Sequence, residues 1–459
     1  MNGDAETDRP LARPPLLKPG QTYATATDQI AAIVLSRKTS KGWWLCFGLS
    51  SVLALGYLLG APIIFSYGPG LFGINIPVAW GFPIVNTVWW IGIGHAGTLI
   101  SAILLLLNQK WRNSINRFAE AMTIFAVIIA GTWPILHLGR PWFFYWLIPY
   151  PSTMGVWPQF RSALVWDFFA ISTYMIVSII FWYMGMVPDL GSLRDRARKR
   201  WQQVAYGLLA LGWRGSVRHW QNYESAYLLL AGFAAPLVVS VHSVISLDFA
   251  ISIEVGYHST IFPPYFVAGA LYSGFCMVLT ILVPMRKVFG LEPYITLRHL
   301  DNAARLLLAA GLFVAHGYIS EFFTEWYSGS TFERTLGWSR ITGPYAFAWW
   351  ITMFCNVLVV QLFWFKRVRR SPWTLWVLSL VINLGMWMER YVIVMTGPAR
   401  SYTSGRWDVV WATLFDLATL IGSIGFFFML MLLFVRFLPA ISIFEVRELV
   451  REQKEEGAP

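Results

Sequence analysis

Charge and cysteine are both scarce in this sequence. Only 13% of the 459 residues are Asp, Glu, Lys or Arg, whereas about a quarter is usual in soluble domains. An ordinary soluble fold is therefore excluded. The three cysteines, Cys46, Cys276 and Cys355, lie far apart inside apolar runs. They predict neither a disulfide framework nor a Cys-ligated zinc or iron–sulfur site, so we expect any such centre on a partner chain.

Three further features are missing. The seven histidines give no helix two ligands at the spacing that a transmembrane haem needs, and no glycine-rich phosphate loop is followed by Lys-Ser or Lys-Thr. No stretch between the apolar runs is long enough for a nucleotide-binding domain. We therefore expect no haem, metal or nucleotide on this chain. The net charge of +11 does not imply nucleic acid, because most basic residues lie in short loops between apolar runs.

Apolar runs are abundant, and 56% of all residues are hydrophobic. At a rise of about 1.5 Å per residue, each run is long enough to cross a hydrocarbon core of about 30 Å. The sequence therefore predicts an all-α polytopic membrane protein with ten transmembrane helices. We place these spans at 42–65, 83–107, 117–137, 162–187, 221–247, 264–285, 300–325, 344–365, 373–397 and 409–435.

The basic residues between the spans alternate by side. One set of connections holds 24 Lys and Arg, with its largest group between Arg194 and Arg218, and the other set holds six. Because Lys and Arg collect in cytoplasmic loops, both termini are predicted to be cytoplasmic. Residues 1–40 and 438–459 then form cytoplasmic tails around a membrane domain at 41–437.

A faint internal repeat divides the spans. Arg117-Phe118-Ala119-Glu120 follows span two, and Arg298-His299-Leu300-Asp301 follows span six, 181 residues later. This repeat predicts two four-helix bundles, spans two to five at 83–247 and spans six to nine at 264–397. Spans one and ten would then be peripheral.

Four ionisable residues are predicted at one depth near the outer face. From the helical rise, His137 lies about 4–5 Å and Asp167 about 9 Å inside the membrane, and Asp248 and Arg390 reach the same level on spans five and nine. Charged groups in spans usually face a cavity or a partner. A neutral imidazole and a carboxylate can accept hydrogen bonds from the two hydroxyls of a quinol. We therefore predict a quinol site here, with His137 and Asp167 as the catalytic pair.

Simpler roles for these residues remain open. His137 can cap the end of span three, Arg390 can reach up to the headgroups, and either aspartate can pair with Arg161 or Arg390. Consecutive helix positions point about 100° apart. We therefore expect Arg390 to face the pocket and Glu389 to lie behind it or on the proton exit.

A second set of ionisable groups extends from the cytoplasmic side of the spans to their middle and outer levels. Such groups can form a proton relay toward the outer site, and we place His95, Glu120, Glu224, His242, Asp301, Glu321, Glu389 and Asp416 in it. The alternative is structural: Glu120 with Arg117, and Asp301 with Arg298 or Arg305, have the spacing of ion pairs within a helix.

Several short motifs occur in a fixed order. They are Gly94-His95-Ala96-Gly97, Leu136-His137-Leu138-Gly139-Arg140-Pro141, Trp166-Asp167, Ser246-Leu247-Asp248 and Glu389-Arg390-Tyr391. Together they resemble the NrfD-like, or polysulfide reductase membrane-subunit, family over roughly residues 40 to 437. Within it the chain is most similar to the larger quinol-binding NrfD-like subunit of alternative complex III.

The resemblance implies two four-helix bundles and an outer quinol pocket built by His137, Asp167, Asp248 and Arg390. It also implies oxidation of a quinol, in particular menaquinol, in a respiratory or photosynthetic complex of the bacterial inner membrane. Electrons would pass to an iron–sulfur cluster of a periplasmic ferredoxin-like subunit and on to multihaem and monohaem cytochrome c subunits. A second NrfD-like subunit and proton translocation are implied as well, with cytochrome c or a copper protein as the final acceptor.

Two other functions stay open. Some members of the family are quinone-reducing anchors of other oxidoreductases. A secondary transporter or proton channel would use the same intramembrane charges, but transporter sites usually lie near the midplane at broken helices. Because the densest charged group here is predicted in the outer leaflet, the quinol interpretation is favoured.

Overall fold

The computed structural model describes residues 15–36, 39–148 and 160–456. Within these residues, ten helical segments are long and apolar enough to cross a membrane, and each overlaps one predicted span. This confirms the all-α polytopic class. The segments are α2 and α3 (Lys41–Leu58 and Gly60–Tyr67), α4 (Gly81–Leu106), α5 (Asn116–His137), α6 (Ala163–Arg196), α8 (Val217–Ala250), α9 (Phe262–Val288), α10 (Leu297–Tyr327), α12 with its continuation to Trp364 (Ala346–Met353), α14 (Pro372–Ala399) and α15 (Leu414–Phe437).

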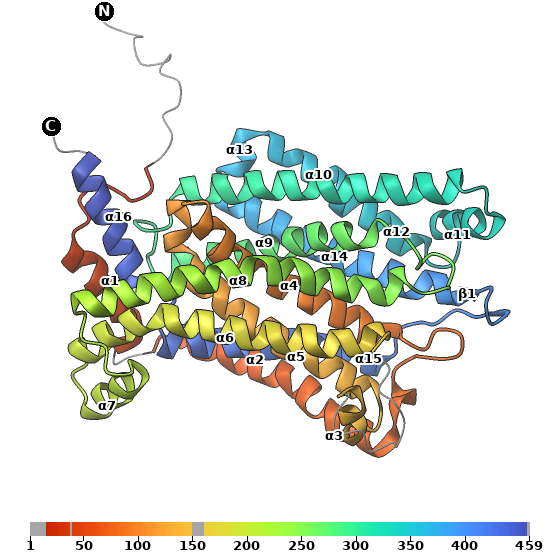
Figure 1. Ribbon diagram of the computed structural model, residues 1–459, viewed down its shortest axis with the longest axis horizontal. Coiled ribbons are helices and arrows are strands. Elements are labelled where there is room, and N and C mark those ends of the chain that lie inside the picture. Colours follow the sequence, from red (N-terminus) through yellow and green to blue (C-terminus); the bar gives the residue numbers. More distant parts are fainter. Residues whose placement is uncertain (1–14, 37–38, 149–159, 457–459) are drawn as a thin grey trace, which may run out of the picture.

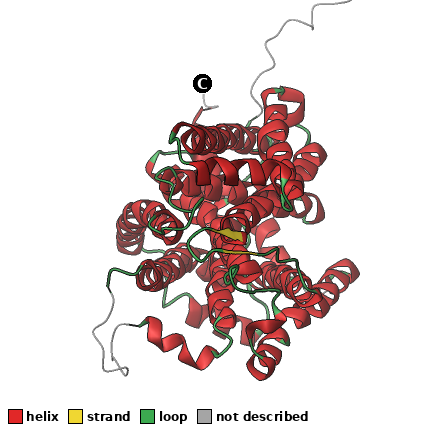
Figure 2. Cartoon of the chain, turned by 90° about the vertical axis from the view of Figure 1, so that its right-hand side faces the viewer, coloured by secondary structure: helices red, strands yellow, loops and turns green. Residues whose placement is uncertain are grey.

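The shorter elements lie mainly at the two ends of this helical body (Figure 1). They are α1 (Tyr23–Leu35), α7 (Arg200–Leu209), α11 (Thr331–Thr342), α13 (Lys366–Arg369) and α16 (Ile443–Glu456), three 3-10 turns (Pro69–Leu71, Lys110–Ser114 and Pro141–Leu147), and the antiparallel pair β1 (Arg400–Ser401) and β2 (Arg406–Trp407). We call the end with α1, α7 and α16 the α16 end, and the end with α3, α11 and the β pair the α11 end. Figure 2 looks along the helices from the α11 end.

The core is formed by α4 and α9, which pack on each other and are almost wholly buried. Small residues allow the backbones of α4, α5 and α9 to approach one another closely. A Cβ atom on Gly97 of α4 would lie 2.0 Å from the carbonyl oxygen of Ala119 on α5, and one on Gly274 of α9 would lie 2.2 Å from the Cβ of Ala96. No larger side chain fits at either crossing without a shift of the helices.

The two predicted bundles are not separate bodies. The first set, α4, α5, α6 and α8, and the second set, α9, α10, α12 and α14, each make contacts among themselves. However, α4 also packs on α9 and α14, and α8 packs on α9. The division into two bundles therefore stays a prediction. The first and tenth spans pair with each other, since α2 packs along α15, which in turn contacts α5.

The eighth span changes its helical form partway along. After α12, residues Phe354–Leu358 form a π-helix, η4, and Val359–Trp364 form a 3-10 helix, η5. Such wide turns inside a helix often lie at functional sites. Here the wide turn includes the buried residue Asn356, which packs against Gly385 of α14.

The described parts of both predicted tails contain a helix, α1 and α16. In α1, Gln29 donates a hydrogen bond from Nε2 to the carbonyl oxygen of Gly290 (3.0 Å), and the carbonyl of Val34 accepts one from Arg436 (2.8 Å). Helix α16 packs on α1, so the two described ends of the chain meet. Residues 1–14, 37–38 and 457–459 of the expected tails lie outside the described residues.

Candidate functional site

Two of the predicted quinol ligands come together near the α11 end. Asp167 lies close to the start of α6 and Asp248 close to the end of α8, and these helices pack on each other. Their carboxyl groups lie within hydrogen-bonding reach of each other. Two carboxylates have no donor between them, so a hydrogen bond between these groups requires a proton on one of the two. Oδ1 of each carboxyl is buried and accepts no hydrogen bond from an N–H or O–H donor of the described residues.

His137 is the last residue of α5 and is half-buried. Its Nδ1 atom is buried and has no hydrogen-bond partner. Among the described residues, no hydrogen bond or ion pair joins its imidazole to Asp167 or Asp248. Its expected place opposite Asp167 in a quinol pocket therefore stays a prediction.

Arg390, the fourth predicted ligand, is buried in α14 and faces Glu389 and Phe266. Its Nη1 atom lies 2.7 Å from Oε1 of Glu389, and its guanidinium lies 4.3 Å from the centre of the Phe266 ring. The long side chains of these consecutive residues therefore fold back toward each other. With only 2% of its surface exposed, Arg390 does not reach up to the headgroups. Its expected place in the quinol pocket stays a prediction.

Glu389 is held from two further helices. Its Oε2 atom accepts a short hydrogen bond from the hydroxyl of Tyr318 on α10. That hydroxyl accepts one from Nδ2 of Asn356 in the π-helix at 2.8 Å. Neither Tyr318 nor Asn356 was singled out from the sequence, because neither residue type is charged.

Two histidines of the predicted relay meet inside the membrane domain. His95 of α4 and His242 of α8 have ring centres 4.5 Å apart, and the ring of Tyr174 stacks on His95 at 4.8 Å. Nδ1 of His95 donates to the carbonyl oxygen of Ile91 at 2.6 Å. Both ring nitrogens of His242 lack a hydrogen-bond partner. These two side chains are therefore neighbours, as a proton relay requires. Proton transfer between them stays a prediction.

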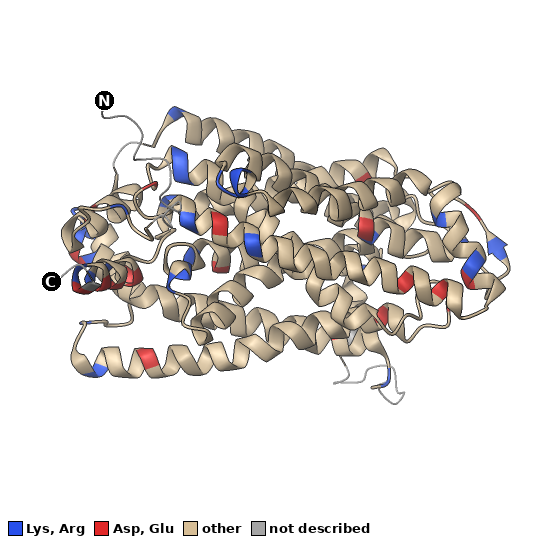
Figure 3. Ribbon diagram, turned by 90° about the horizontal axis from the view of Figure 1, so that it is seen from above, with Lys and Arg blue, Asp and Glu red and all other residues tan. Residues whose placement is uncertain are grey.

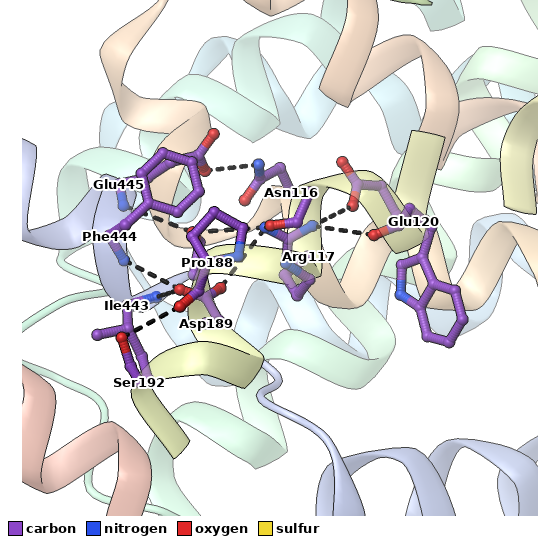
Figure 4. A network of polar contacts seen from close by, with 12 residues as sticks. Asn116, Arg117, Glu120, Pro188, Asp189, Ser192, Ile443, Phe444 and Glu445 are labelled. Carbon is purple, nitrogen blue, oxygen red and sulfur yellow. Dashed lines mark hydrogen bonds and ion pairs between the residues drawn. The ribbon is translucent and has the colours of Figure 1, made fainter. Parts of the chain in front are cut away.

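A buried polar network fills the α16 end (Figure 4). Arg117 lies 3.0 Å from Glu120 and 3.6 Å from Asp189, and it donates to the carbonyl oxygen of Gly185 at 2.6 Å. Glu120 also accepts from the hydroxyl of Tyr227 at 3.1 Å. The structural alternative for Glu120, an ion pair with Arg117, is thus formed.

The same network attaches α16. Oδ1 of Asp189 accepts hydrogen bonds from the backbone N–H groups of Ile443 (3.0 Å) and Phe444 (3.1 Å), at the start of that helix. Glu445 binds Arg112 at 2.9 Å and Asn116 at 2.6 Å. Burial alone would lower the pKa of Arg112, but the neighbouring Glu445 carboxylate outweighs it, so the pKa is raised and the guanidinium stays charged. Asp189 and Glu445 were both missed from the sequence.

The remaining residues of the predicted relay have other neighbours. Asp301 forms ion pairs with Arg305 (2.9 Å) and Arg369 (2.8 Å). Asp416 caps α15 by accepting hydrogen bonds from the N–H groups of Thr413 (2.9 Å) and Gly73 (3.1 Å). These contacts give both residues a structural role, and their part in a relay stays a prediction.

Glu321 and Glu224 lie at opposite ends of the helical body. Glu321, near the end of α10, pairs with Arg340 of α11 at 2.9 Å. Glu224 lies exposed near the start of α8. Within residues 15–36, 39–148 and 160–456, no three His, Cys, Asp or Glu side chains are grouped to hold a metal ion.

Comparison with known proteins now identifies the class. The family described as polysulphide reductase, NrfD, matches residues 71–400, well over half of the chain. The chain therefore belongs to the NrfD family, and it is a multi-pass, NrfD-like membrane subunit of the kind found in oxidoreductase complexes.

Three relatives are similar to this chain. It is 21% identical over 419 residues to the C subunit of the selenate reductase of Mesobacillus selenatarsenatis, covering 87% of this chain and 94% of that one. It is 24% identical to the membrane-bound C subunit of a candidate dimethyl sulfoxide reductase of Halobacterium salinarum (53% of this chain, 51% of the relative). It is also 24% identical to an Hdr-like menaquinol oxidoreductase integral membrane subunit of Archaeoglobus fulgidus (59% and 56%). The matches thus span about half the length of the last two relatives.

Proposed function

We propose that this chain binds and oxidises quinol as the membrane subunit of an electron-transfer complex. The observation that carries the proposal is the pair of adjacent carboxyl groups, Asp167 and Asp248, within the membrane domain. Oxidation of a quinol to a quinone releases two electrons and two protons. A carboxyl pair that holds one proton has room for another, and its oxygens can accept a hydrogen bond from one quinol hydroxyl.

His137 completes this proposed site. A buried imidazole nitrogen without a partner is available to accept the second hydroxyl and to take its proton. The electrons then leave to an iron–sulfur cluster of a periplasmic partner, because this chain is expected to bind no metal centre of its own. In this proposal His95, His242 and Glu120 belong to a route for protons.

The finer assignment is to the larger NrfD-like subunit of alternative complex III in a bacterial inner membrane, with menaquinol as substrate and cytochrome c or a copper protein as the final acceptor. Cytochrome c subunits and a second NrfD-like subunit would be its partners. The name of the Archaeoglobus relative, a menaquinol oxidoreductase subunit, supports quinol as the substrate.

The second candidate function is that of a quinone-reducing anchor. The relatives named as subunits of selenate and dimethyl sulfoxide reductases do not favour it, because reduction of either compound consumes the electrons that a quinol gives up. In such an anchor the same carboxyl pair would deliver protons to a quinone instead of accepting them. A transporter or proton channel remains the third possibility.

The test uses the intact complex purified with its partners. We expect Asp167→Asn, Asp248→Asn and His137→Ala each to lower quinol-dependent reduction of the electron acceptor by about 10²- to 10⁴-fold, the range for loss of a positioned acid or base. Asp195→Asn is the matched control, since this aspartate is exposed at the other end of α6. Full activity in all three variants, with assembly intact, would refute the proposed site. Faster quinone reduction than quinol oxidation would favour the anchor, and solute uptake into liposomes by the chain alone would favour a transporter.

A further inference from the structure

A cavity of about 690 Å³ lies among α10, α11, α12 and α14, apart from the Asp167–Asp248 pair. Most of its wall is apolar. Its polar groups are those of Glu321, Glu325, Arg340, Glu389, Tyr318, Thr352 and, from α9, Tyr265. Its volume is within the range of about 300–1,000 Å³ that is usual for small-molecule sites. A mostly apolar wall with a few convergent polar groups is typical of a site for an amphiphile.

The rim of this cavity faces the lipid. Phe323 and Trp326 of α10 and Trp338 of α11 line it, and their side chains are 55%, 61% and 65% exposed. Large apolar side chains that lie exposed on a membrane protein contact lipid or sit at its interface. A ligand with an apolar tail can therefore enter from the bilayer with its tail between these rings.

The polar wall has more acceptors than donors. Arg340 donates to Glu325 (2.6 Å) and Glu321 (2.9 Å) from Nη1, to Thr396 (3.1 Å) from Nε, and to the carbonyl of Gly256 (3.3 Å) from Nη2. One guanidinium thus serves two carboxylates, and four of its five N–H groups are used. Oε2 of Glu325 is buried and has no hydrogen-bond partner. The site therefore lacks a donor at this atom.

The missing donor defines the ligand. A phospholipid phosphate is an acceptor and an anion, so the carboxylates would repel it and Arg340 has too few free N–H groups to bind it. A quinone carbonyl is also only an acceptor. A quinol hydroxyl donates, carries no charge and belongs to a molecule with an apolar tail.

We propose that this cavity is a second quinol site, in which Oε2 of Glu325 accepts a hydrogen bond from one ring hydroxyl and the tail leaves over Phe323, Trp326 and Trp338. It binds the reduced form in preference to the oxidised form. The inference rests on the proposed function, which makes quinol the ligand, but it concerns binding only. No electron transfer is assigned to this cavity.

Two variants test the acceptor by different means. Glu325→Gln replaces the carboxylate by a neutral amide. Gly337→Ala keeps the carboxylate but places a Cβ atom 2.9 Å from Oε2 of Glu325, so it obstructs that atom. The matched control is Glu333→Gln, on the same helix, where the carboxylate pairs with His258 (2.9 Å).

The probe is a photoreactive azido-menaquinol, kept reduced, with the intact complex in nanodiscs. Peptide mapping by mass spectrometry is expected to find labels on α10 and α11 as well as near Asp167. Labelling of α10 and α11 should fall about tenfold in both variants, since Glu325→Gln replaces the charged acceptor by a weaker, neutral one and Gly337→Ala obstructs it. It should be unchanged in Glu333→Gln and in Asp167→Asn.

Three results would overturn the second site. They are no label on α10 or α11 in the native complex, undiminished label there in both variants, and equal labelling by the oxidised probe. The proposed function is tested separately, by the turnover of Asp167→Asn. Label on α10 and α11 alone, with full turnover of that variant, would leave the cavity as a quinol site and reject the Asp167–Asp248 site.

Discussion

At the scale of single residues, Arg340 is a buried cation that is shared by two carboxylates. It is buried at the α11 end, where it faces Glu321 and Glu325 with its Nη1 atom. Burial alone would lower its pKa, but Glu325 and Glu321 together outweigh this, so the pKa is raised and the residue stays a cation. Its removal would leave two carboxylates without a counterion.

The first prediction follows from the two carboxylates that would lose their counterion. We expect Arg340→Met to lower the stability of the purified chain by about 3–5 kcal/mol, the usual cost of breaking a buried ion pair from one side. Arg334→Met, on the same helix with an exposed hydrogen bond to the carbonyl of Trp326, should cost less than about 1 kcal/mol. Thermal unfolding in detergent, followed by tryptophan fluorescence, measures both. Equal unfolding midpoints for the two variants would contradict the prediction.

Residue pairing was predictable from the sequence only where it is local. Arg117 and Glu120 are three positions apart on one helix, so their contact follows from helical spacing. The contacts between Arg340 and Glu325, and between Asp189 and the start of α16, depend on how separate helices pack. The rotation of each helix about its axis decides them, and hydropathy does not fix that rotation.

At the scale of elements, the crossing of α4 and α5 depends on the absence of one side chain. Gly97 lies where a Cβ atom would come within 2.2 Å of Oγ1 of Thr123 as well as 2.0 Å of the Ala119 carbonyl. Gly97→Ala should therefore push the helices apart and destabilise the chain by about 1–3 kcal/mol. Gly232→Ala on α8 is the control, because nothing lies within 4 Å of its added Cβ, and it should be neutral or stabilising by up to about 1 kcal/mol. The comparison of unfolding midpoints decides, and a stable Gly97→Ala variant would refute the close crossing.

The attachment of α16 gives a second prediction at this scale. Asp189→Ala removes the acceptor for the N–H groups of Ile443 and Phe444, a loss comparable to that of an N-cap, about 1–2 kcal/mol. Hydrogen exchange in residues 443–456 should then be roughly 5- to 30-fold faster. Asp195→Ala, an exposed aspartate of the same helix, should leave it unchanged. If α16 stays equally protected in both variants, its attachment depends on other contacts.

The elements themselves were predicted unequally. All ten spans overlap helices of the structure, because length and hydropathy determine which segments can lie in lipid. Helices α1 and α16 were predicted as tails, because their polar residues lower the mean hydropathy of segments in which only one face packs against the protein. The change of helical form at Phe354–Leu358 gave no signal in the sequence, because it contains neither proline nor glycine.

At the scale of the whole molecule, charge is distributed unevenly between the two ends. Lys and Arg gather mainly toward the α16 end, and fewer lie at the α11 end (Figure 3). The alternation predicted from the sequence therefore corresponds to two ends of one body. Which end faces the cytoplasm follows only from the rule that basic loops stay inside.

Labelling of intact cells tests that orientation. We expect Thr403→Cys, exposed between β1 and β2, to react with a membrane-impermeant maleimide in spheroplasts. Gln221→Cys, exposed near the start of α8, should react only after permeabilisation. The native cysteines give the background, to be measured in the unmodified chain. The reverse pattern would place both described ends of the chain outside the cytoplasm.

Because the eighth span contains a π-helix, the number of residues in this span determines which of its side chains face the neighbouring helices. Removal of one residue between Phe354 and Leu358 would remove the wide π-helical turn and would not disturb hydropathy. It would also shift the register of the preceding segment against the rest by about 100°. Asn356, or the residue in its place, would then turn away from Tyr318. The Tyr318 hydroxyl, which donates to Glu389, would lose the hydrogen bond that it accepts from Asn356. A deletion that leaves the hydropathy profile unchanged would thus alter contacts of the eighth span, of α10 and of α14 together.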